Sequence, residues 1–258
     1  MNKFRTNFLF LFVVLLGACG GESTEPNLVV ADSCSGPSTL ASRMSISSEQ
    51  EFLQQMNRSG AVDGACISGI KGVRTFTNLV EVSGRLDIFG EKGLRISFPK
   101  LTRVGSSIFI AEGVEADFPA LETVELLEDL SGSATLALPQ LLSIEDLVST
   151  SALTSLDSLS DSGSIQVRGL AAGKLRTAAS VVMASTSSTP LLQSAGTLSL
   201  VGTATAPIDV QLPSFQRAND VTIAGHVLRL ELPALADATT LWFRATPEFD
   251  SLDFPLLT

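Results

Sequence analysis

The sequence predicts an all-β protein built as a single-stranded solenoid, in which each repeat forms one coil stacked on the next. The first observation behind this prediction is a recurring phrase: a large apolar residue, proline, any residue, and a second apolar residue. The phrases begin at Phe98, Phe118, Leu138, Leu212, Leu232 and Phe254, at intervals of 20, 20, 74, 20 and 22 residues. A fixed period near 20 residues is typical of solenoids.

The second observation is a period of two around each phrase. Residues 94–98 and 228–232 carry apolar side chains at every second position, which predicts short strands with one buried face. Proline has no N–H to donate, so it ends each strand at a corner. A second short strand is expected after the corner, as at 108–110 and 241–243. Two such strands and their corners fill the period and leave no room for a helix.

One short helix is expected before the coils. Ser48 and Glu51 have the spacing of a capping box, and Phe52, Leu53 and Met56 follow at helical spacing. An amphipathic helix at this point would cover the first coil of the solenoid.

Residues 1–18 predict a lipoprotein signal peptide. Lys3 and Arg5 precede an apolar run that is too short to span a bilayer as a helix. The run ends in Leu16-Gly17-Ala18-Cys19, which resembles the bacterial lipobox, in which the cysteine is lipidated. The alternative is an ordinary cleaved signal followed by an incidental cysteine.

The lipobox resemblance implies lipid attachment at Cys19 and anchoring to a membrane through that lipid. Gly20 follows it rather than Asp, which by the same resemblance favours the outer membrane of a bacterial cell envelope, facing the periplasm or the surface. Residues 19–33 are polar and are expected to form a tether.

The charge of the chain argues against nucleic acid as a partner. Removing residues 1–18 takes away Lys3 and Arg5 and no acidic residue, which leaves 15 Lys and Arg against 27 Asp and Glu and a net charge of −12. An acidic protein of this kind repels anionic polymers.

Two further cysteines, Cys34 and Cys66, form an even pair once Cys19 carries lipid. In an exported chain they are expected to form a disulfide, and two reduced, buried cysteines are the alternative. We expect residues 34–66 to form an N-terminal cap with the helix and this bond. Two cysteines and the single His226 offer too few ligands for a metal site.

The cysteines and the coils together resemble the receptor L domain family. Cys34, the helix region from Ser45, Cys66-Ile67-Ser68-Gly69 and coils of the form apolar-Pro-x-Leu-x-x-Val carry the resemblance. It implies a right-handed β-helix with its solenoid repeats at residues 67–258. It also implies ligand binding of the kind found in receptor members, and it supplies no catalytic residue and no binding residue that can be matched here.

The coils become uneven between residues 145 and 190. Apolar alternation persists there at intervals of about 16 to 23 residues, in a stretch rich in Ser, Ala and Thr. We expect one continuous solenoid with a narrower section, and a linker between two domains is the alternative.

The sequence contains no recognisable catalytic motif, and we expect no catalytic residue, cofactor or metal. A lone histidine such as His226 is more often a corner residue than a member of a triad. Acidic residues gather in two places, which are Glu125, Glu128 and Asp129 in the first and Asp157 and Asp161 in the second. Carboxylate pairs serve glycoside hydrolysis or calcium binding, but a solvated acidic corner is the expected state of both groups.

Two function classes remain. The first is a non-catalytic, lipid-anchored envelope protein that is structural or binds a protein or glycan partner. The alternative is a β-helix polysaccharide lyase or hydrolase, and the mixed Ser, Thr and Gln of the exposed strand positions favour the first class. Strand alternation turns Phe109 and Trp242 outward, so both are candidate partner contacts unless a neighbouring loop covers them.

Setting the phrases in register yields a test of the coil alignment. It places Arg95 beside Glu115 and Asp209 beside Arg229 in successive coils.

Overall fold

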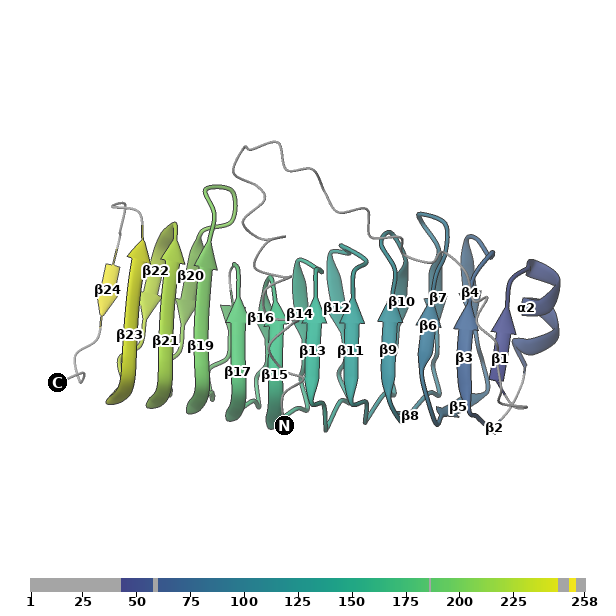
Figure 1. Ribbon diagram of the computed structural model, residues 1–258, viewed down its shortest axis with the longest axis horizontal. Helices are drawn as coiled ribbons and strands as arrows, with labels where there is room; N and C mark the ends of the chain where they lie inside the picture. The colour runs from purple at the N-terminus through teal and green to yellow at the C-terminus, as the bar shows by residue number, and fades with distance from the viewer. Residues whose placement is uncertain (1–42, 58–59, 186, 246–250, 254–258) are drawn as a thin grey trace. The chain divides into compact units, whose positions relative to one another are not determined.

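The structure is a computed structural model, which describes residues 43–57, 60–185, 187–245 and 251–253. These residues form a β-solenoid with one short helix, as expected (Figure 1). Within each of the four sheets, neighbouring strands come from successive coils and pair in parallel. The all-β solenoid prediction is therefore confirmed.

The largest sheet has eleven strands and runs the length of the stack. Its strands are β1 (Arg43–Ile46), β3 (Gly64–Ile67), β6 (Leu86–Ile88), β9 (Ser107–Ile110), β11 (Leu126–Asp129), β13 (Asp146–Ser149), β15 (Asp161–Val167), β17 (Thr177–Met183), β19 (Ser194–Gly202), β21 (Arg217–Gly225) and β23 (Asp237–Ala245). Since β1 and β3 already belong to this sheet, the ladder begins before residue 67.

A second flank of the solenoid carries two sheets one after the other. The three-stranded sheet contains β4 (Val73–Thr75), β7 (Arg95–Ser97) and β10 (Glu115–Asp117). The seven-stranded sheet contains β12 (Thr135–Ala137), β14 (Leu153–Ser155), β16 (Leu170–Ala171), β18 (Ser187–Ser188), β20 (Ile208–Gln211), β22 (Val227–Glu231) and β24 (Ser251–Asp253). A short third sheet is made of β2 (Gly60–Val62), β5 (Leu79–Val82) and β8 (Arg103–Val104).

The proline phrases form the corners. In each of the five phrases that the structure describes, the first apolar residue accepts a hydrogen bond from the N–H three residues later, as from Leu101 to Phe98 at 3.3 Å and from Leu235 to Leu232 at 3.1 Å. This is a β-turn with proline at its second position, where the fixed φ of proline fits. The same turn closes at Thr189 and Leu192, so Pro190 marks a further corner that the apolar phrase did not reveal.

Both register markers are confirmed. Arg95 pairs with Glu115 in the parallel register of β7 and β10, and the Nε–Oε2 distance is 2.8 Å. Arg229 lies beside Asp209 in β22 and β20, and its Nη2 is 2.7 Å from Oδ1.

The solenoid continues without a break through the uneven section. In the largest sheet, Leu147, Ile165, Val181 and Leu198 are consecutive register partners, only 18, 16 and 17 residues apart. The side chain at the first turn position becomes smaller along with the coil. It is Phe98 and Phe118 in the wide coils, then Leu138 and Leu156, and then Ala172 and Thr189. Shorter coils with smaller inward side chains make a narrower solenoid, so the linker alternative is wrong.

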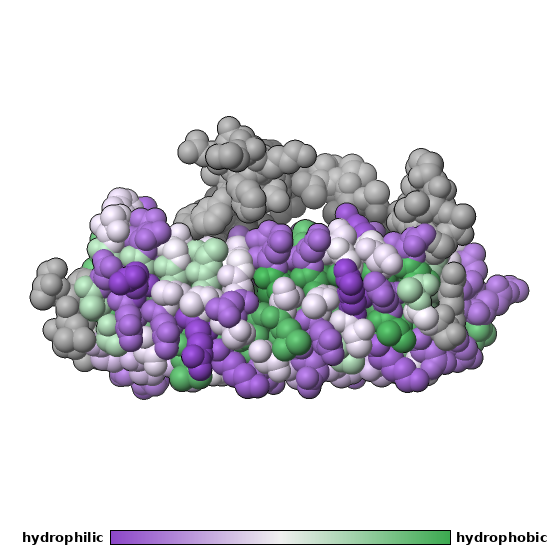
Figure 2. Space-filling model, turned by 90° about the horizontal axis from the view of Figure 1, so that it is seen from below, coloured by the Kyte–Doolittle hydropathy of each residue, from purple (hydrophilic) through white to green (hydrophobic). Residues whose placement is uncertain are grey.

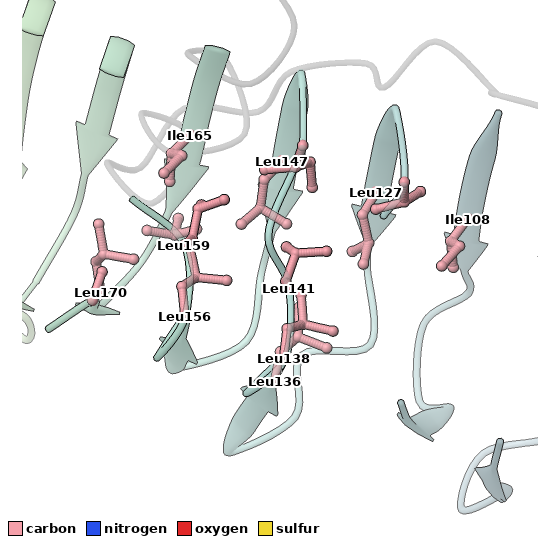
Figure 3. Packing of buried hydrophobic residues seen from close by; sticks show 14 of the residues in the cluster. Ile108, Leu127, Leu136, Leu138, Leu141, Leu147, Leu156, Leu159, Ile165 and Leu170 are labelled. Atoms are coloured by element: carbon pink, nitrogen blue, oxygen red, sulfur yellow. The ribbon is translucent and has the colours of Figure 1, made fainter. Parts of the chain in front are cut away.

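The core is a continuous column of aliphatic side chains that point inward from the facing strands (Figure 3). At its N-terminal end the column is aromatic. The rings of Phe76, Phe98 and Phe118 stack nearly parallel, with centroids 5.2 and 5.3 Å apart. Phe52 meets the end of this stack edge-on at 5.3 Å.

The helix that carries Phe52 is α2 (Glu49–Gln55), and it covers the first coil as expected. Ser48 accepts the N–H of Glu51 at 3.3 Å, as expected of a capping box, and the Glu51 carboxylate accepts the N–H and hydroxyl of Ser47 at 2.6 and 2.8 Å. Leu53 was expected on the apolar face with Phe52, yet it is 60% exposed because one seven-residue helix buries only a narrow stripe. Met56 is partly buried against the core.

Cys66 lies in β3 and is disulfide-bonded. Cys34 and Cys19 lie outside the described residues, so the Cys34–Cys66 pairing and the lipid attachment stay predictions.

Candidate functional site

The ladder on the second flank is interrupted between β10 and β12, and we call this interval the seam. Elsewhere on the flank each coil bonds to the next, as from the Phe98 N–H to the Asp117 carbonyl at 2.9 Å and from the Leu138 N–H to the Ser155 carbonyl at 3.0 Å. The corresponding bond from Phe118 to Ala137 is absent, and β10 and β12 belong to separate sheets. The seam thus leaves two strand edges open within the described part of the chain.

A buried polar cluster lies beside the seam. The cluster interrupts a row of inward-facing residues in the largest sheet. Asp129 and Ser149 are the two polar members of this stretch of the row, whose register partners are Ile46, Ile67, Ile88, Ile110, Asp129, Ser149 and Val167. The Asp129 carboxylate is 1% exposed and accepts the hydroxyls of Ser149 and Ser151, each at 2.6 Å, and the N–H of Ser131 at 3.0 Å. The cost of burying this group is offset because these donors satisfy it.

The Asp129 cluster ties the loop before β12 to the following coil. Gly132 donates its N–H to the Thr150 hydroxyl at 3.1 Å, and the hydroxyls of Ser133 and Ser151 are 2.8 Å apart. Toward the preceding coil, this loop (residues 130–134) has two backbone hydrogen bonds, from the Leu130 N–H to the Ile110 carbonyl and from the Gly113 N–H to the Ser131 carbonyl, and both lie before β12. The loop and β12 therefore stay with β14, which opens the seam on the side of β10.

The expectation of a solvated acidic corner at residues 125–129 is wrong for Asp129. Glu125 is exposed and Glu128 is half-buried, but strand alternation turns Asp129 into the core. At the second acidic group both Asp157 and Asp161 are exposed, as expected. Hydrogen bonds from Thr177 and Ser160 lower the pKa of Asp161.

A groove of about 480 Å³ opens at the seam and is lined by β4, β7, β10, β12 and the loop before β12. Ile96, Ala116 and Ala134 supply apolar wall. The small side chains of Ala116 and Ala134 leave the space that a larger inward residue would fill.

Charged and hydroxyl groups line the rest of the groove. Arg95 is ion-paired with Glu115, and Arg74 reaches Glu49 of α2 at 2.8 Å. The Asp117 carboxylate accepts the Ser97 hydroxyl at 3.1 Å and has no cationic partner among the described residues. The groove therefore presents one carboxylate whose charge is not neutralised.

The structure does not bring the two predicted partner contacts together. Trp242 on β23 is 62% exposed, whereas Phe109 on β9 is half-buried against Phe89 with ring centroids 5.3 Å apart. Seven strand intervals separate them in the largest sheet, about 34 Å at about 4.8 Å per strand. Neither residue lines the groove. The sequence reasoning missed the groove because the break in pairing that forms it depends on contacts between coils.

The remaining candidates supply no constellation for chemistry. Among the described residues, no three His, Cys, Asp or Glu side chains are arranged to hold a metal ion, and no helix is long and apolar enough to cross a membrane. His226 lies at the corner between β21 and β22, where its N–H donates to Gly202 and its carbonyl accepts from Ile208. Figure 2 shows separate apolar patches among hydrophilic side chains on the face it displays.

We find no family model, curated protein or solved structure that matches this chain.

Asp146 supplies a test of the electrostatics of the coils. Burial first, and then the neighbouring Glu145 carboxylate, raise its pKa above the ordinary 3.8. The native state thus binds this proton more tightly than the unfolded chain does, so the free energy of unfolding falls as the pH rises through the interval between the two pKa values. Asp146→Asn is expected to raise the melting temperature at pH 7 and to leave it nearly unchanged at pH 3.

Asp161→Asn is the matched control, measured by thermal unfolding at the same two pH values. Its lowered pKa means that the ionised carboxylate stabilises the fold above pH 3.8 and that this contribution is lost as the pH falls through the folded pKa. The control is therefore expected to lower the melting temperature at pH 7. Equal shifts in both variants would contradict the assignment.

Proposed function

We propose that this protein is a non-catalytic binding module of the cell envelope, anchored by lipid, whose groove recognises a protein or glycan partner. The observation that carries the proposal is the seam, where rigid stacked coils hold polar side chains and open strand edges around a concave surface. A preorganised site of this kind binds without a large ordering cost.

The alternative function is a polysaccharide lyase or hydrolase. In its favour, Glu115 and Asp117 are alternate residues of one strand, about 7 Å apart, and both line the groove. Both carboxylates are exposed to solvent, however, whereas glycoside hydrolysis takes place in sites that exclude water. Glu115 is also held in an ion pair with Arg95, so binding is the function that this geometry supports better.

The anchoring part of the proposal is supported by the signal region and the lipobox-like residues 16–19. The disulfide bond of Cys66 fits an exported protein, because disulfides persist in oxidising compartments. The cysteines and coils support a relationship to the receptor L domain family, with an outer-membrane location facing the periplasm or the surface.

Cys19→Ser tests the anchor. The variant is expected to move from the membrane fraction to the soluble fraction, since a protein without its acyl chains has no remaining attachment of comparable strength. The measurement is fractionation of cells that express the full chain, followed by mass spectrometry of the N-terminal peptide. A variant that stays with the membranes would show that the anchor lies elsewhere.

The non-catalytic part of the proposal is tested by incubating the purified protein with a panel of acidic and neutral polysaccharides. We expect no new reducing ends and no unsaturated products above the level of a Glu115→Gln/Asp117→Asn double variant. Turnover by the parent protein that the double variant lacks would establish the alternative function and assign its residues.

A further inference from the structure

We propose that the outward face of β9, β11 and β13 binds a basic amphipathic helix of a partner polypeptide, in which Lys or Arg side chains flank an apolar stripe. This face belongs to the largest sheet, whereas the groove lies on the second flank of the solenoid. The inference therefore adds a second interaction surface and does not depend on the proposed function of the groove.

The first argument is a stripe of apolar side chains that turns away from the core. Alternation along the three strands directs Phe109, Leu126 and Val148 outward, while the strand residues beside them are buried. Leu126 is 37% exposed, and the other two are half-buried. The one helix in the described part of the chain, α2, lies at the first coil, so no described helix covers this stripe.

The spacing of the stripe fits a helix that crosses the strands. Phe109 and Val148 are both register partners of Glu128, so they lie two strand intervals apart, about 9.6 Å. Residues seven positions apart lie on one face of an α-helix and are separated by about 10.5 Å along its axis. Such a helix can place one apolar side chain beside Phe109 and a second beside Val148, with Leu126 on the strand between them.

The second argument is the charge of the middle coils. Residues 104–167 contain no Lys or Arg, and they contain eleven acidic residues, which are Glu112, Glu115, Asp117, Glu122, Glu125, Glu128, Asp129, Glu145, Asp146, Asp157 and Asp161. A surface built from these coils attracts basic partners and repels acidic ones.

Four of these carboxylates gather around Leu126. Asp146 is its register partner, and Glu128 is the next outward residue of β11. Glu125 and Glu145 stand where the chain enters β11 and β13, and the Glu145 N–H donates to the Glu125 carbonyl at 3.0 Å. The apolar stripe is therefore bordered by acidic side chains.

None of these four carboxylates has a cationic partner among the described residues. In a later coil, by contrast, Asp209 is ion-paired with Arg229. Arg85, whose guanidinium lies over the Phe109 ring at 6.0 Å, is itself ion-paired with Asp87. Carboxylates that the protein does not neutralise, placed around an apolar stripe, favour a partner that is both basic and amphipathic.

The test uses the purified full chain and three blocked synthetic peptides. The first peptide carries leucines at helical spacing and lysines on the opposite face, the second has glutamate in place of each lysine, and the third has the composition of the first without helical periodicity. Binding is measured by calorimetry at physiological ionic strength. The first peptide is expected to bind about tenfold more tightly than the third, and the second is expected not to bind.

Removing two charges from the face should weaken binding of the first peptide about fivefold in Glu125→Gln/Glu128→Gln, since each exposed ion pair contributes up to about fivefold. The matched control is Asp63→Asn/Asp220→Asn, which removes the same charge at exposed positions elsewhere. It should weaken binding less than about twofold, because salt screens charges at that distance.

The apolar part of the face is tested in the same way. Leu126→Ser is expected to weaken binding of the first peptide about fivefold, because less apolar surface is buried in the complex. Leu228→Ser is the control, since Leu228 is 45% exposed on β22 of the second flank, and it should leave the affinity unchanged.

Carbodiimide cross-linking, which joins peptide lysines to protein carboxylates, locates the bound peptide without any substitution. Cross-links to Glu125, Glu128 or Glu145 are expected, and cross-links confined to other carboxylates, such as Asp117 in the groove, would overturn the proposal. This readout decides the question even where a substitution lowers the melting temperature. The proposal is also wrong if the first peptide does not bind, if the first and third peptides bind equally, or if the two double variants weaken binding to the same extent.

Discussion

Phe98→Ala should lower the free energy of unfolding by about 3–5 kcal/mol, the largest effect that we expect from a single core substitution. Phe98 has 0% exposure, and the rings of Phe76 and Phe118 lie on either side of it, with interplanar angles of 4°. Its neighbours are fixed by the coils above and below, so the cavity left by alanine cannot collapse. Chemical denaturation in urea measures the change.

Phe98→Leu is the matched control, because the protein itself places leucine at this turn position in Leu138 and Leu232, both fully buried. The control is expected to lose about half as much stability as the alanine variant, since leucine refills most of the space but loses the stacked ring contacts. Equal losses in the two variants would show that the ring stack, rather than filled volume, dominates the stability of this end of the solenoid.

The architecture was predictable from the sequence because the solenoid repeats its local rules. Proline at a fixed place in most coils predicted the corner, and a constant period placed Arg95 beside Glu115 without any knowledge of long-range contacts. The same rule failed to identify the corner at Thr189 because the interior there is too narrow for a large apolar residue. The repeated phrase was defined by the large apolar residue before proline, and not by the β-turn in which proline takes part.

The groove was not predictable in this way. It depends on Asp129, which sequence reasoning grouped with Glu125 and Glu128 as a solvated cluster. Alternation along β11 contained a usable signal, because Asp129 stands where the preceding coil has the buried Ile110. A charged residue in an inward register position is costly unless donors surround it, and three of its donors come from the loop before β12 and the following coil. Whether such donors are present is a property of the stack and not of the local sequence.

The Asp129 cluster is expected to hold the seam open, and removing its carboxylate should be costly. In Asp129→Ala the hydroxyls of Ser149 and Ser151 and the N–H of Ser131 lose their acceptor in a buried site. An unsatisfied buried group costs about 1–3 kcal/mol, and we expect a total loss of about 3 kcal/mol in the free energy of unfolding because local rearrangement satisfies some of the donors. Urea denaturation measures this loss.

The double variant Asp129→Ile/Ser149→Val separates the energetic role of the cluster from its geometric role. It restores the aliphatic row defined by Ile110 and Val167, and replacing a buried polar cluster by well-packed apolar residues is often neutral or stabilising. The double variant is therefore expected to regain most of the stability that Asp129→Ala loses. With the loop before β12 released, β12 should also pair with β10, so the amide of Ala137 is expected to exchange with solvent at least about tenfold more slowly than in the parent protein. A variant that recovers stability while this amide exchanges at the parent rate would show that the seam is held open by something other than Asp129.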